Sequence, residues 1–436
     1  MQTVFSKQRI DELLADMEIS DLNHASIRQI GAIARAMEHE TGQEYIHFEM
    51  GIPGLPPSAI GVEAEIEALR RGVASQYPNI EGTDDLKTEA SRFVKAFIDA
   101  DIAPKGCIPT TGSMQGVFAA FMLCTQLDPK RNAILYLDPG FPVQKMQAAV
   151  IGAKVRSFDV ADYRGADALR SRMEQELADG DVACIIYSNP NNPSWMCLCD
   201  DELQVIGELA TKHDVIVIED LAYMTMDFRK RLGHPFQPPF QPTVSRYTDN
   251  YILMVSGSKI FSYAGQRIAV ACISDALFRR PYATLAARYG ISRFGAAYAY
   301  DMLYPLSSGV SHSAQCAMAA MMRAATDGQY CFVDDVREYA RRTERIKEIM
   351  LRHGFHVVYD CDQDEVVSDG LFFTIGYRDM EGGELLRQLL YHGITGIVLS
   401  TTGSTRQGIR ACCSTMQERH YPLLEERCRL FAQNHP

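Results

Sequence analysis

Four short apolar runs between residues 132 and 256 constrain the fold of this chain most strongly. They are NAILYL (132–137), DVACIIYS (181–188), DVIVIED (214–220) and NYILMVS (250–256). Each run is apolar at consecutive positions rather than at alternate ones, which is typical of strands in a sheet that helices cover on both faces. Longer stretches with helical spacing, such as 114–127 and 201–212, separate these runs. The sequence therefore predicts an α/β fold around a mainly parallel sheet.

The remaining segments predict additional, smaller units. A chain of 436 residues is long enough for two or three packed subdomains. The first 45 residues have helical spacing, and FEMGIPGLPP (48–57) is typical of an extended crossing segment. After residue 307, a helical run over 313–353 precedes the short strands HVVYD, LFFTIG and GIVLS and a helix at 383–392. We expect a smaller α+β domain there.

Charge and cysteine placement exclude several classes of function. The 43 basic and 55 acidic residues are scattered and give a net charge of −12, which argues against nucleic-acid binding. The first 20 residues lack the apolar core of a signal peptide, and no membrane-spanning run occurs, so we expect a cytoplasmic protein with no membrane partner. Most of the twelve cysteines lie in apolar runs, and neither Cys197/Cys199 nor Cys412/Cys413 has zinc-site spacing. We therefore expect no metal.

Polar residues gather where the predicted strands end, the edge at which open α/β sheets bind ligands. Gly112 and Ser113, in PTTGSMQGVF, precede a helix, so they predict either a phosphate site or an ordinary serine N-cap. Phe141, in LDPGFP, follows a strand and either stacks on a flat ring or packs in the core or over a turn. In SNPNNPSW, two Asn-Pro steps either orient Asn192 as a donor or simply stiffen a turn.

Two further clusters carry charge. Asp220 ends a very apolar strand, three residues before Tyr223, and a carboxylate there needs a cation, such as a protonated pyridine nitrogen, unless it caps the next helix. SGSKIFSYAGQR places Lys259 after another strand. A desolvated lysine has a lowered pKa and forms Schiff bases with carbonyls, whereas a loop lysine faces solvent. Nearby hydroxyl and guanidinium groups suit a phosphate dianion, and they belong to Ser256, Ser258 and Arg267.

Together, the order and spacing of these motifs resemble the fold type I pyridoxal-phosphate aminotransferases of class I and II, over roughly residues 45–415. The resemblance implies a large domain with a mainly parallel seven-stranded sheet and a smaller α+β domain. It assigns residues 1–60 to an N-terminal arm and part of the small domain. Residues 61–310 would form the large pyridoxal-phosphate-binding domain, and residues 311–436 the small C-terminal domain.

The resemblance also implies roles for the cofactor-site residues. Lys259 would hold pyridoxal 5′-phosphate as an internal aldimine and move the proton, with Asp220 and Tyr223 as the other catalytic residues. Asp220 would lie under the pyridine nitrogen, and Tyr223 and Asn192 would donate to the ring oxygen. Phe141 would stack on the ring. The phosphate would contact Gly112, Ser113, Met114, Ser256, Ser258 and Arg267.

Substrate and partner residues follow from the same resemblance. Arg410, in GIRACCS, would bind the substrate carboxylate, with the backbone of Gly51 and the side chain of Asn192 beside it. Tyr77, in SQYPNIEGTDDL, would reach the phosphate of a neighbouring subunit, which implies a homodimer with shared active sites. The implied activity is ping-pong transfer of an amino group from a neutral or aromatic L-amino acid to a 2-oxo acid.

Alternatives and departures remain open. A carbon–sulfur β-lyase would use the same scaffold, and a less favoured alternative is an aminotransferase-like regulatory protein, although about 45 residues without a basic helix-turn-helix pattern precede FEMGIP. AYDMLYPLSS (299–308) lacks an arginine for a second carboxylate, which disfavours aspartate unless Arg288 or Arg293 serves. Trp195 replaces the usual glycine and either narrows the pocket entrance or packs against the surface. Gln266 replaces a frequent apolar residue.

Overall fold

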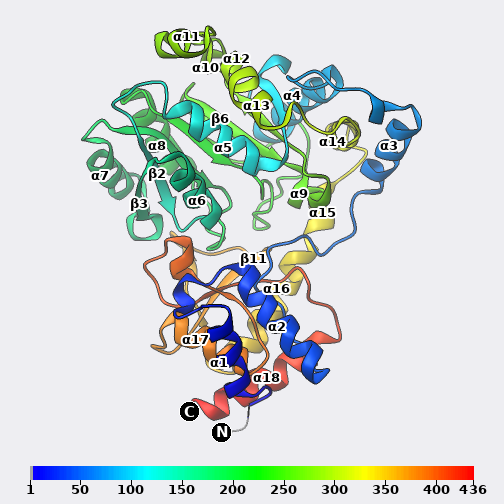
Figure 1. Ribbon diagram of the computed structural model, residues 1–436, viewed down its shortest axis with the longest axis vertical. Coiled ribbons are helices and arrows are strands. Elements are labelled where there is room, and N and C mark those ends of the chain that lie inside the picture. The colour runs from blue at the N-terminus through cyan, green and yellow to red at the C-terminus, as the bar shows by residue number, and fades with distance from the viewer. Residues whose placement is uncertain (1–2) are drawn as a thin grey trace.

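The computed structural model describes residues 3–436 and has two parts, each built on its own sheet (Figure 1). The larger part contains a seven-stranded sheet in the order β1-β7-β6-β5-β4-β2-β3. Only β7 runs antiparallel to its neighbours, so the predicted mainly parallel sheet is confirmed. The strands are β1 (Cys107–Thr110), β2 (Ala133–Asp138), β3 (Lys154–Asp159), β4 (Val182–Ser188), β5 (Ile216–Asp220), β6 (Tyr251–Ser256) and β7 (Ala269–Ile273).

The central strands are apolar throughout because both faces of the sheet are covered. Ile252 and Met254 of β6 belong to one apolar core, together with side chains of α5. Leu253 and Val255, which point the other way, belong to a second core with side chains of α8. The helices of this part are α3 (Ala59–Arg70), α4 (Asp84–Ile98), α5 (Gly112–Cys124), α6 (Pro142–Ile151), α7 (Ala166–Leu177), α8 (Asp200–Lys212), α9 (Gly257–Ile260), α10 (Asp275–Arg279), α11 (Ala283–Tyr289), α12 (Phe294–Ala296), α13 (Tyr304–Ser307) and α14 (His312–Thr326).

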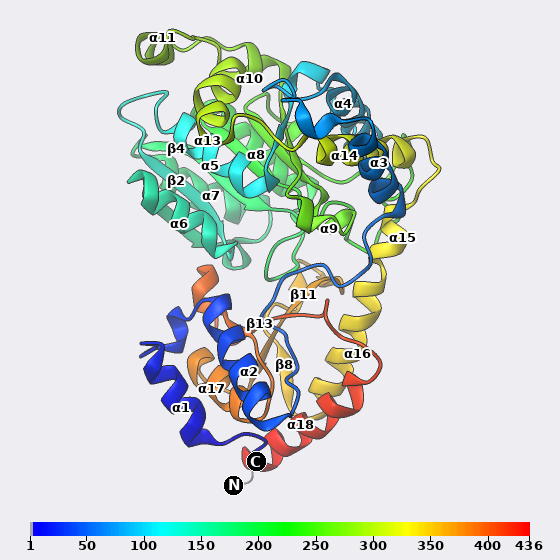
Figure 2. The same ribbon diagram turned by 45° about the vertical axis from the view of Figure 1, so that its right-hand side comes forward.

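The smaller part is built on an antiparallel sheet in the order β12-β13-β11-β8, with a separate two-stranded ribbon. Both ends of the chain meet there: the N-terminal helices lie beside the C-terminal ones in both views (Figures 1 and 2). The strands are β8 (Phe355–Val357), β9 (Cys361–Asp362), β10 (Glu365–Val366), β11 (Phe372–Tyr377), β12 (Ile397–Val398) and β13 (Ile409–Cys412). The helices are α1 (Lys7–Asp16), α2 (Ile27–Thr41), α16 (Glu338–Arg352), α17 (Gly382–Tyr391) and α18 (His420–Asn434). The short helix α15 (Phe332–Val336) lies between the two parts, with Phe332 packed against Phe93 and Phe261 of the larger part.

The prediction of one continuous helical run after residue 312 is wrong. The helical run expected over 313–353 is three helices, α14, α15 and α16. The chain turns after α14 at Gly328, whose φ of +72° ends the helix. Because α14 packs against α3 and α4 of the larger part, it lies beside that part rather than with the smaller sheet. The division at residues 60 and 310 stays a proposal.

The two parts are joined by few crossings. Residues 49–58 lead from the small part to α3, and α15 and α16 lead back (Figure 2). The carboxyl ends of β4, β5 and β6 face this junction, so a ligand bound there contacts both parts. Within residues 3–436, none of the helices combines the length and apolar character that crossing a bilayer requires.

Candidate active site

A cavity of about 280 Å³ lies between the strand ends of the large sheet and the small sheet. Strand-end residues Ser188, Asp220 and Ser256 form one side of it. Phe372 and Arg410 reach it from β11 and β13 of the small sheet. The remaining lining residues come from helix starts and loops: Ile27, Met50, Gly51, Ile52, Ser113, Met114, Phe141, Asn192, Ala222, Tyr223, Ser258, Lys259, Ala264 and Arg267.

Lys259 lies in the short helix α9, directly after β6. Its Nζ donates to the backbone carbonyl oxygen of Gly51, and burial lowers the pKa of the amine to about 8. The nearby guanidinium groups of Arg410 and Arg267 also disfavour its charged form, while Cys412 acts in the opposite direction. A buried amine with this pKa is partly neutral near pH 7.5 and can act as a nucleophile toward a carbonyl or as a base.

Asp220 is a buried carboxylate with no cationic partner among residues 3–436. It accepts hydrogen bonds from the backbone N–H of Ala222 at 3.2 Å and from Nε2 of Gln144 at 3.3 Å. Burial raises the pKa of this carboxyl to about 6, although both hydrogen bonds act in the opposite direction. A cationic group in the cavity would stabilise the ionised form, as a pyridinium N–H would.

Asn192 and Tyr223 form a polar pair on the cavity wall. Nδ2 of Asn192 donates to the Tyr223 hydroxyl oxygen at 3.2 Å, and its backbone N–H donates to Oγ of Ser188 at 3.1 Å. Oδ1 of Asn192 is buried and finds no hydrogen-bond partner in the part of the chain that the structure describes. Burial, together with Asp220, raises the pKa of the Tyr223 hydroxyl, so this group stays protonated and can donate.

The start of α5 and Arg267 form a cradle for an anion. The first N–H groups of α5 have no acceptor within the helix and point out of its N-terminus. Gly112 has a φ of +70°, and a Cβ atom there would overlap the guanidinium group of Arg267. Arg267 is held by its Nη1 donating to the Ala264 carbonyl at 3.0 Å and to Oγ of Ser258 at 3.5 Å. The site suits a phosphate dianion.

Arg410 is a second arginine of the cavity, and it reaches the cavity from β13 of the small sheet. Its side chain is 1% exposed, its Nη2 donates to the Glu49 carbonyl oxygen, and its Nε has no partner among the described residues. Its guanidinium carbon lies 4.9 Å from the centre of the Phe372 ring. Burial lowers the pKa of Arg410. At Gly51, a Cβ atom would lie 2.8 Å from Cζ of Phe372, so only glycine leaves this corner open.

The structure therefore brings together almost all of the residues that the sequence singled out. Gly112 lies directly behind the lining, against Arg267, and Phe141 lines the cavity at the start of α6. Tyr77 is the exception: it is 90% exposed and lies in a different surface hollow, beside Ser307 and His312. Arg288, Arg293 and Gln266 do not line the cavity either.

Several lining residues escaped the sequence reasoning. Ser188 closes β4 and supports Asn192, and its place at a strand end was the signal that could have identified it. Ile27 and Phe372 come from distant parts of the sequence, and no local pattern marks them. Both interpretations of Trp195 are wrong, because its side chain is fully buried behind the cavity wall and lies neither at the entrance nor at the surface.

The family model described as aminotransferase class I and II matches residues 45–422. Aspartate aminotransferase of Sulfolobus acidocaldarius is 22% identical over 250 residues, which span 57% of this chain and 60% of that protein. Glutamate-pyruvate aminotransferase AlaC of Escherichia coli K12 is 26% identical over 320 residues, or 72% of this chain and 70% of that one. A Thermus thermophilus aspartate aminotransferase mutant has the same fold, with a TM-score of 0.74 and 16% identity, covering 93% of this chain and 96% of the other.

Proposed function

The chain belongs to the aminotransferase class I and II family, and we propose that it transfers the amino group of an L-amino acid to a 2-oxo acid in two half-reactions. Members of this family use pyridoxal phosphate. One observation carries the proposal: a single cavity holds a buried lysine of lowered pKa, a buried carboxylate that no cation among residues 3–436 pairs with, and a buried arginine. Lys259 would supply the amine that binds the cofactor and moves the proton. Asp220 would supply the carboxylate for the ring nitrogen, and Arg410 the cation for the substrate carboxylate.

The residues present fit the cofactor. Asp220 lacks a cation and Oδ1 of Asn192 lacks a donor among the described residues, so both have capacity for a polar ligand. The α5 start and Arg267 would hold the phosphate, with Ser256 and Ser258 beside it, and Phe141 would cover the ring. When bound, pyridoxal phosphate supplies a conjugated ring that accepts the electrons left when an amino acid loses its Cα proton.

Each residue of the cavity would then have its own role in the reaction. Lys259 would hold the cofactor covalently and, once released, would take the Cα proton of the amino acid on Nζ and deliver it to C4′, the former aldehyde carbon of the cofactor. Asp220 would keep a proton on the ring nitrogen. Tyr223 and Asn192 would orient the ring through hydrogen bonds, and Arg410 would bind the substrate carboxylate with its planar guanidinium fork.

The lining favours a neutral substrate side chain. The lining includes the apolar side chains of Ile27, Met50, Ile52 and Met114. The cationic side chains that line it are Lys259, Arg267 and Arg410, and each has a role already. No further cation lines the cavity within the described residues to pair with a second carboxylate. This supports a neutral or aromatic amino acid as the donor.

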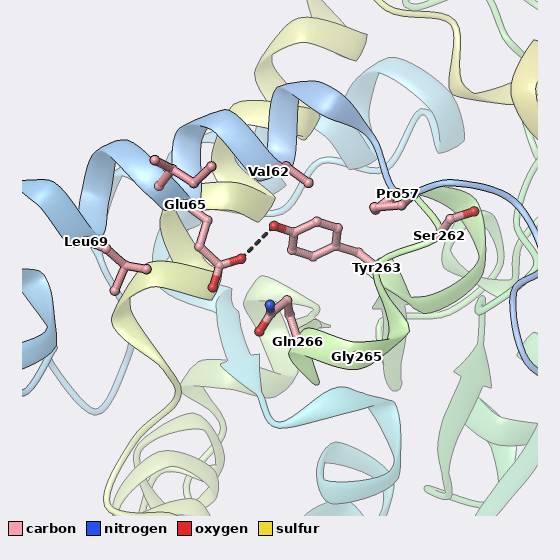
Figure 3. Close-up of a pocket in the computed structure, with 9 residues that line it drawn as sticks. Pro57, Val62, Glu65, Leu69, Ser262, Tyr263, Gly265 and Gln266 are labelled. Atoms are coloured by element: carbon pink, nitrogen blue, oxygen red, sulfur yellow. Dashed lines mark hydrogen bonds between the residues drawn. The ribbon is translucent and has the colours of Figure 1, made fainter.

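We also propose a homodimer with shared sites. Tyr77 does not line its own cavity, so a role at a phosphate requires a second copy. A hollow of about 400 Å³ lies between α3 and the loop after Lys259 (Figure 3), and Leu69 lines both this hollow and the one that contains Tyr77. Two of its lining residues are joined by a 2.6 Å hydrogen bond from the Tyr263 hydroxyl to Glu65, and Leu69 is 48% exposed. Covering this surface would remove exposed apolar area from water.

The test combines spectroscopy with product analysis. Purified protein loaded with pyridoxal phosphate should show a visible absorbance band, and borohydride reduction followed by peptide mapping should place the cofactor on Lys259. A panel of amino donors with pyruvate or 2-oxoglutarate should then bleach the band without ammonia release. Lys259→Ala should abolish turnover. Pyruvate and ammonia from cysteine-like substrates would instead identify a β-lyase, and a Lys259→Ala variant with normal turnover would overturn the mechanism.

A further inference from the structure

Trp195, the only tryptophan of the chain, is held in an unfavourable conformation. Its φ is +64°, a region that bulky side chains rarely occupy. Its side chain is fully buried, and its indole N–H has no acceptor within residues 3–436. Both features disfavour the folded state. A residue with these two disadvantages is kept in place by its packing, so its neighbours indicate what it does.

The indole ring packs against two aromatic residues that line the cavity. The Trp195 and Tyr223 ring centres are 5.5 Å apart with an interplanar angle of 60°, and the Trp195 and Phe372 ring centres are 6.2 Å apart with an angle of 65°. Tyr223 and Phe372 also contact each other, at 5.6 Å and 79°. These are favourable edge-to-face arrangements. Trp195 itself does not line the cavity and lies one layer behind it.

The backbone of Gly370 also packs against the indole, beside Cε2, Cζ2 and Nε1. A Cβ atom at Gly370 would overlap the ring of Trp195, so the two are in direct contact. Oγ1 of Thr343 donates a 2.6 Å hydrogen bond to the Gly370 carbonyl, which ties this backbone to α16. The indole is therefore packed against the backbone of Gly370 and against the two cavity rings.

Each of the two cavity rings contacts a different functional residue of the site. Tyr223 accepts the hydrogen bond from Asn192 on the cofactor side. Phe372 lies under the guanidinium group of Arg410, at 4.9 Å, on the side proposed for the substrate carboxylate. Trp195 thus contacts one cavity ring from the large part and one from the small part, and a shift of its indole would move both rings.

We propose that Trp195 is a positioning residue that fixes Tyr223 against Phe372 and so sets the spacing between the cofactor contacts and Arg410. The proposal rests on the proposed function. A residue that only filled the core would affect stability alone. A positioning residue also affects how tightly the substrate carboxylate binds and the environment of the cofactor ring.

The first test is Trp195→Phe, which replaces the two-ring indole with a smaller phenyl ring at the same backbone position. We expect KM for the amino donor to rise about tenfold, with a smaller change in kcat, and the pH midpoint of the cofactor absorbance to shift. The matched control is Phe431→Leu, because Phe431 belongs to a similar cluster with Phe355 and Tyr377 in the small part. That variant should lose stability and keep the wild-type KM and absorbance midpoint.

A second variant disturbs the same contact from the other side. Gly370→Ala adds a methyl group that would overlap the intact indole and displace it, and this should raise KM in the same way. In the double variant, the methyl group occupies the space left by the shorter phenyl ring, so KM should partly recover. If both single variants lower Tm as Phe431→Leu does, while KM and the absorbance midpoint stay at wild-type values, Trp195 only fills the core and the proposal fails.

The wild-type protein gives a readout that needs no variant. All indole emission comes from Trp195, so loading with pyridoxal phosphate should quench it, and acetate bound at Arg410 should shift it. Acetate binding that changes the cofactor absorbance but leaves the emission unchanged would contradict the proposal. Failure of the proposed function would look different: wild-type protein would show no cofactor band and no adduct on Lys259.

Discussion

Gln144 donates a 3.3 Å hydrogen bond from Nε2 to Oδ2 of Asp220, which lies at the end of a fully buried strand. The only other hydrogen bond to this carboxylate comes from the backbone of Ala222, at 3.2 Å, within the part of the chain described. Two neutral donors compensate incompletely for burial, and the pKa of Asp220 is raised to about 6. The cofactor-free protein is therefore less stable than it would be with a neutral group at this position.

Asp220→Asn tests this directly in the cofactor-free protein. The folded-state pKa of about 6 exceeds the ordinary value of 3.8, so the folded state binds the proton more tightly and loses stability as pH rises from 3.8 through 6. The variant should be more stable than the wild type at pH ~7.5, by up to about 3 kcal/mol, and no more stable at pH ~4. Urea unfolding at both pH values measures this. An equal difference at the two pH values would contradict the assignment.

Lys259 should react with the cofactor at a lower pH than an exposed lysine. Because burial lowers its pKa to about 8, the fraction of neutral amine rises through that pH rather than through 10.5. The rate at which pyridoxal phosphate attaches to cofactor-free protein should therefore have its midpoint near pH 8, as followed by stopped-flow absorbance. A rate that keeps rising up to a midpoint above pH 10 would show that the amine is solvated.

Gly112 and Gly152 form a matched pair for testing the anion cradle. Both have a φ of +70°, but a Cβ atom at Gly112 would overlap Arg267, whereas nothing lies within 4 Å of one at Gly152. Alanine at either position should destabilise the fold by about 1 kcal/mol through backbone strain. Only Gly112→Ala should weaken pyridoxal-phosphate affinity, by at least about tenfold, as measured by equilibrium titration. Equal affinity in the two variants would place the phosphate elsewhere.

The sequence predicts the sheet and its ligand-binding edge well, for a physical reason. Strands covered on both faces are apolar at every position, so runs such as 214–220 and 250–256 are recognisable without any three-dimensional information. Their polar ends must then lie at one edge of the sheet, because parallel strands share a direction. The position of Asp220 and Lys259 at this edge follows from local information, whereas their roles follow from the resemblance carried by all the motifs together.

Residues that reach the site from elsewhere could not be predicted in this way. Phe372 lies in a strand that is buried at all six positions, so its pattern does not show which side chain faces a ligand. Ile27 lines the cavity from the first turn of α2, more than 200 residues before Lys259. Trp195 packs behind Tyr223 because Gly370 leaves room for it, and that pairing depends on the docking of the two parts.

Arg410→Lys should show whether carboxylate binding needs only a positive charge or also the planar shape of the guanidinium group. Lysine keeps the positive charge but loses the planar fork that binds both carboxylate oxygens, and it cannot stack on Phe372 in the same way. We expect kcat/KM to fall at least about a hundredfold, mainly through KM, with the cofactor absorbance unchanged. Steady-state kinetics with a single donor measures this. A variant that keeps its KM would move the carboxylate site away from Arg410.

Mixed dimers would show whether Tyr77 serves the neighbouring site. If each site takes Lys259 from one subunit and Tyr77 from the other, a hybrid of Lys259→Ala and Tyr77→Phe subunits contains one intact site and one with both defects. Subunits that reassort at random should then regain about a quarter of wild-type activity, well above the average of the parent dimers. The control mixes Lys259→Ala with Asp220→Ala. Because both of these residues line the same cavity of one chain, this hybrid has no intact site and should regain nothing. Recovery in neither mixture, with reassortment verified by mass spectrometry, would confine Tyr77 to a surface role in its own subunit.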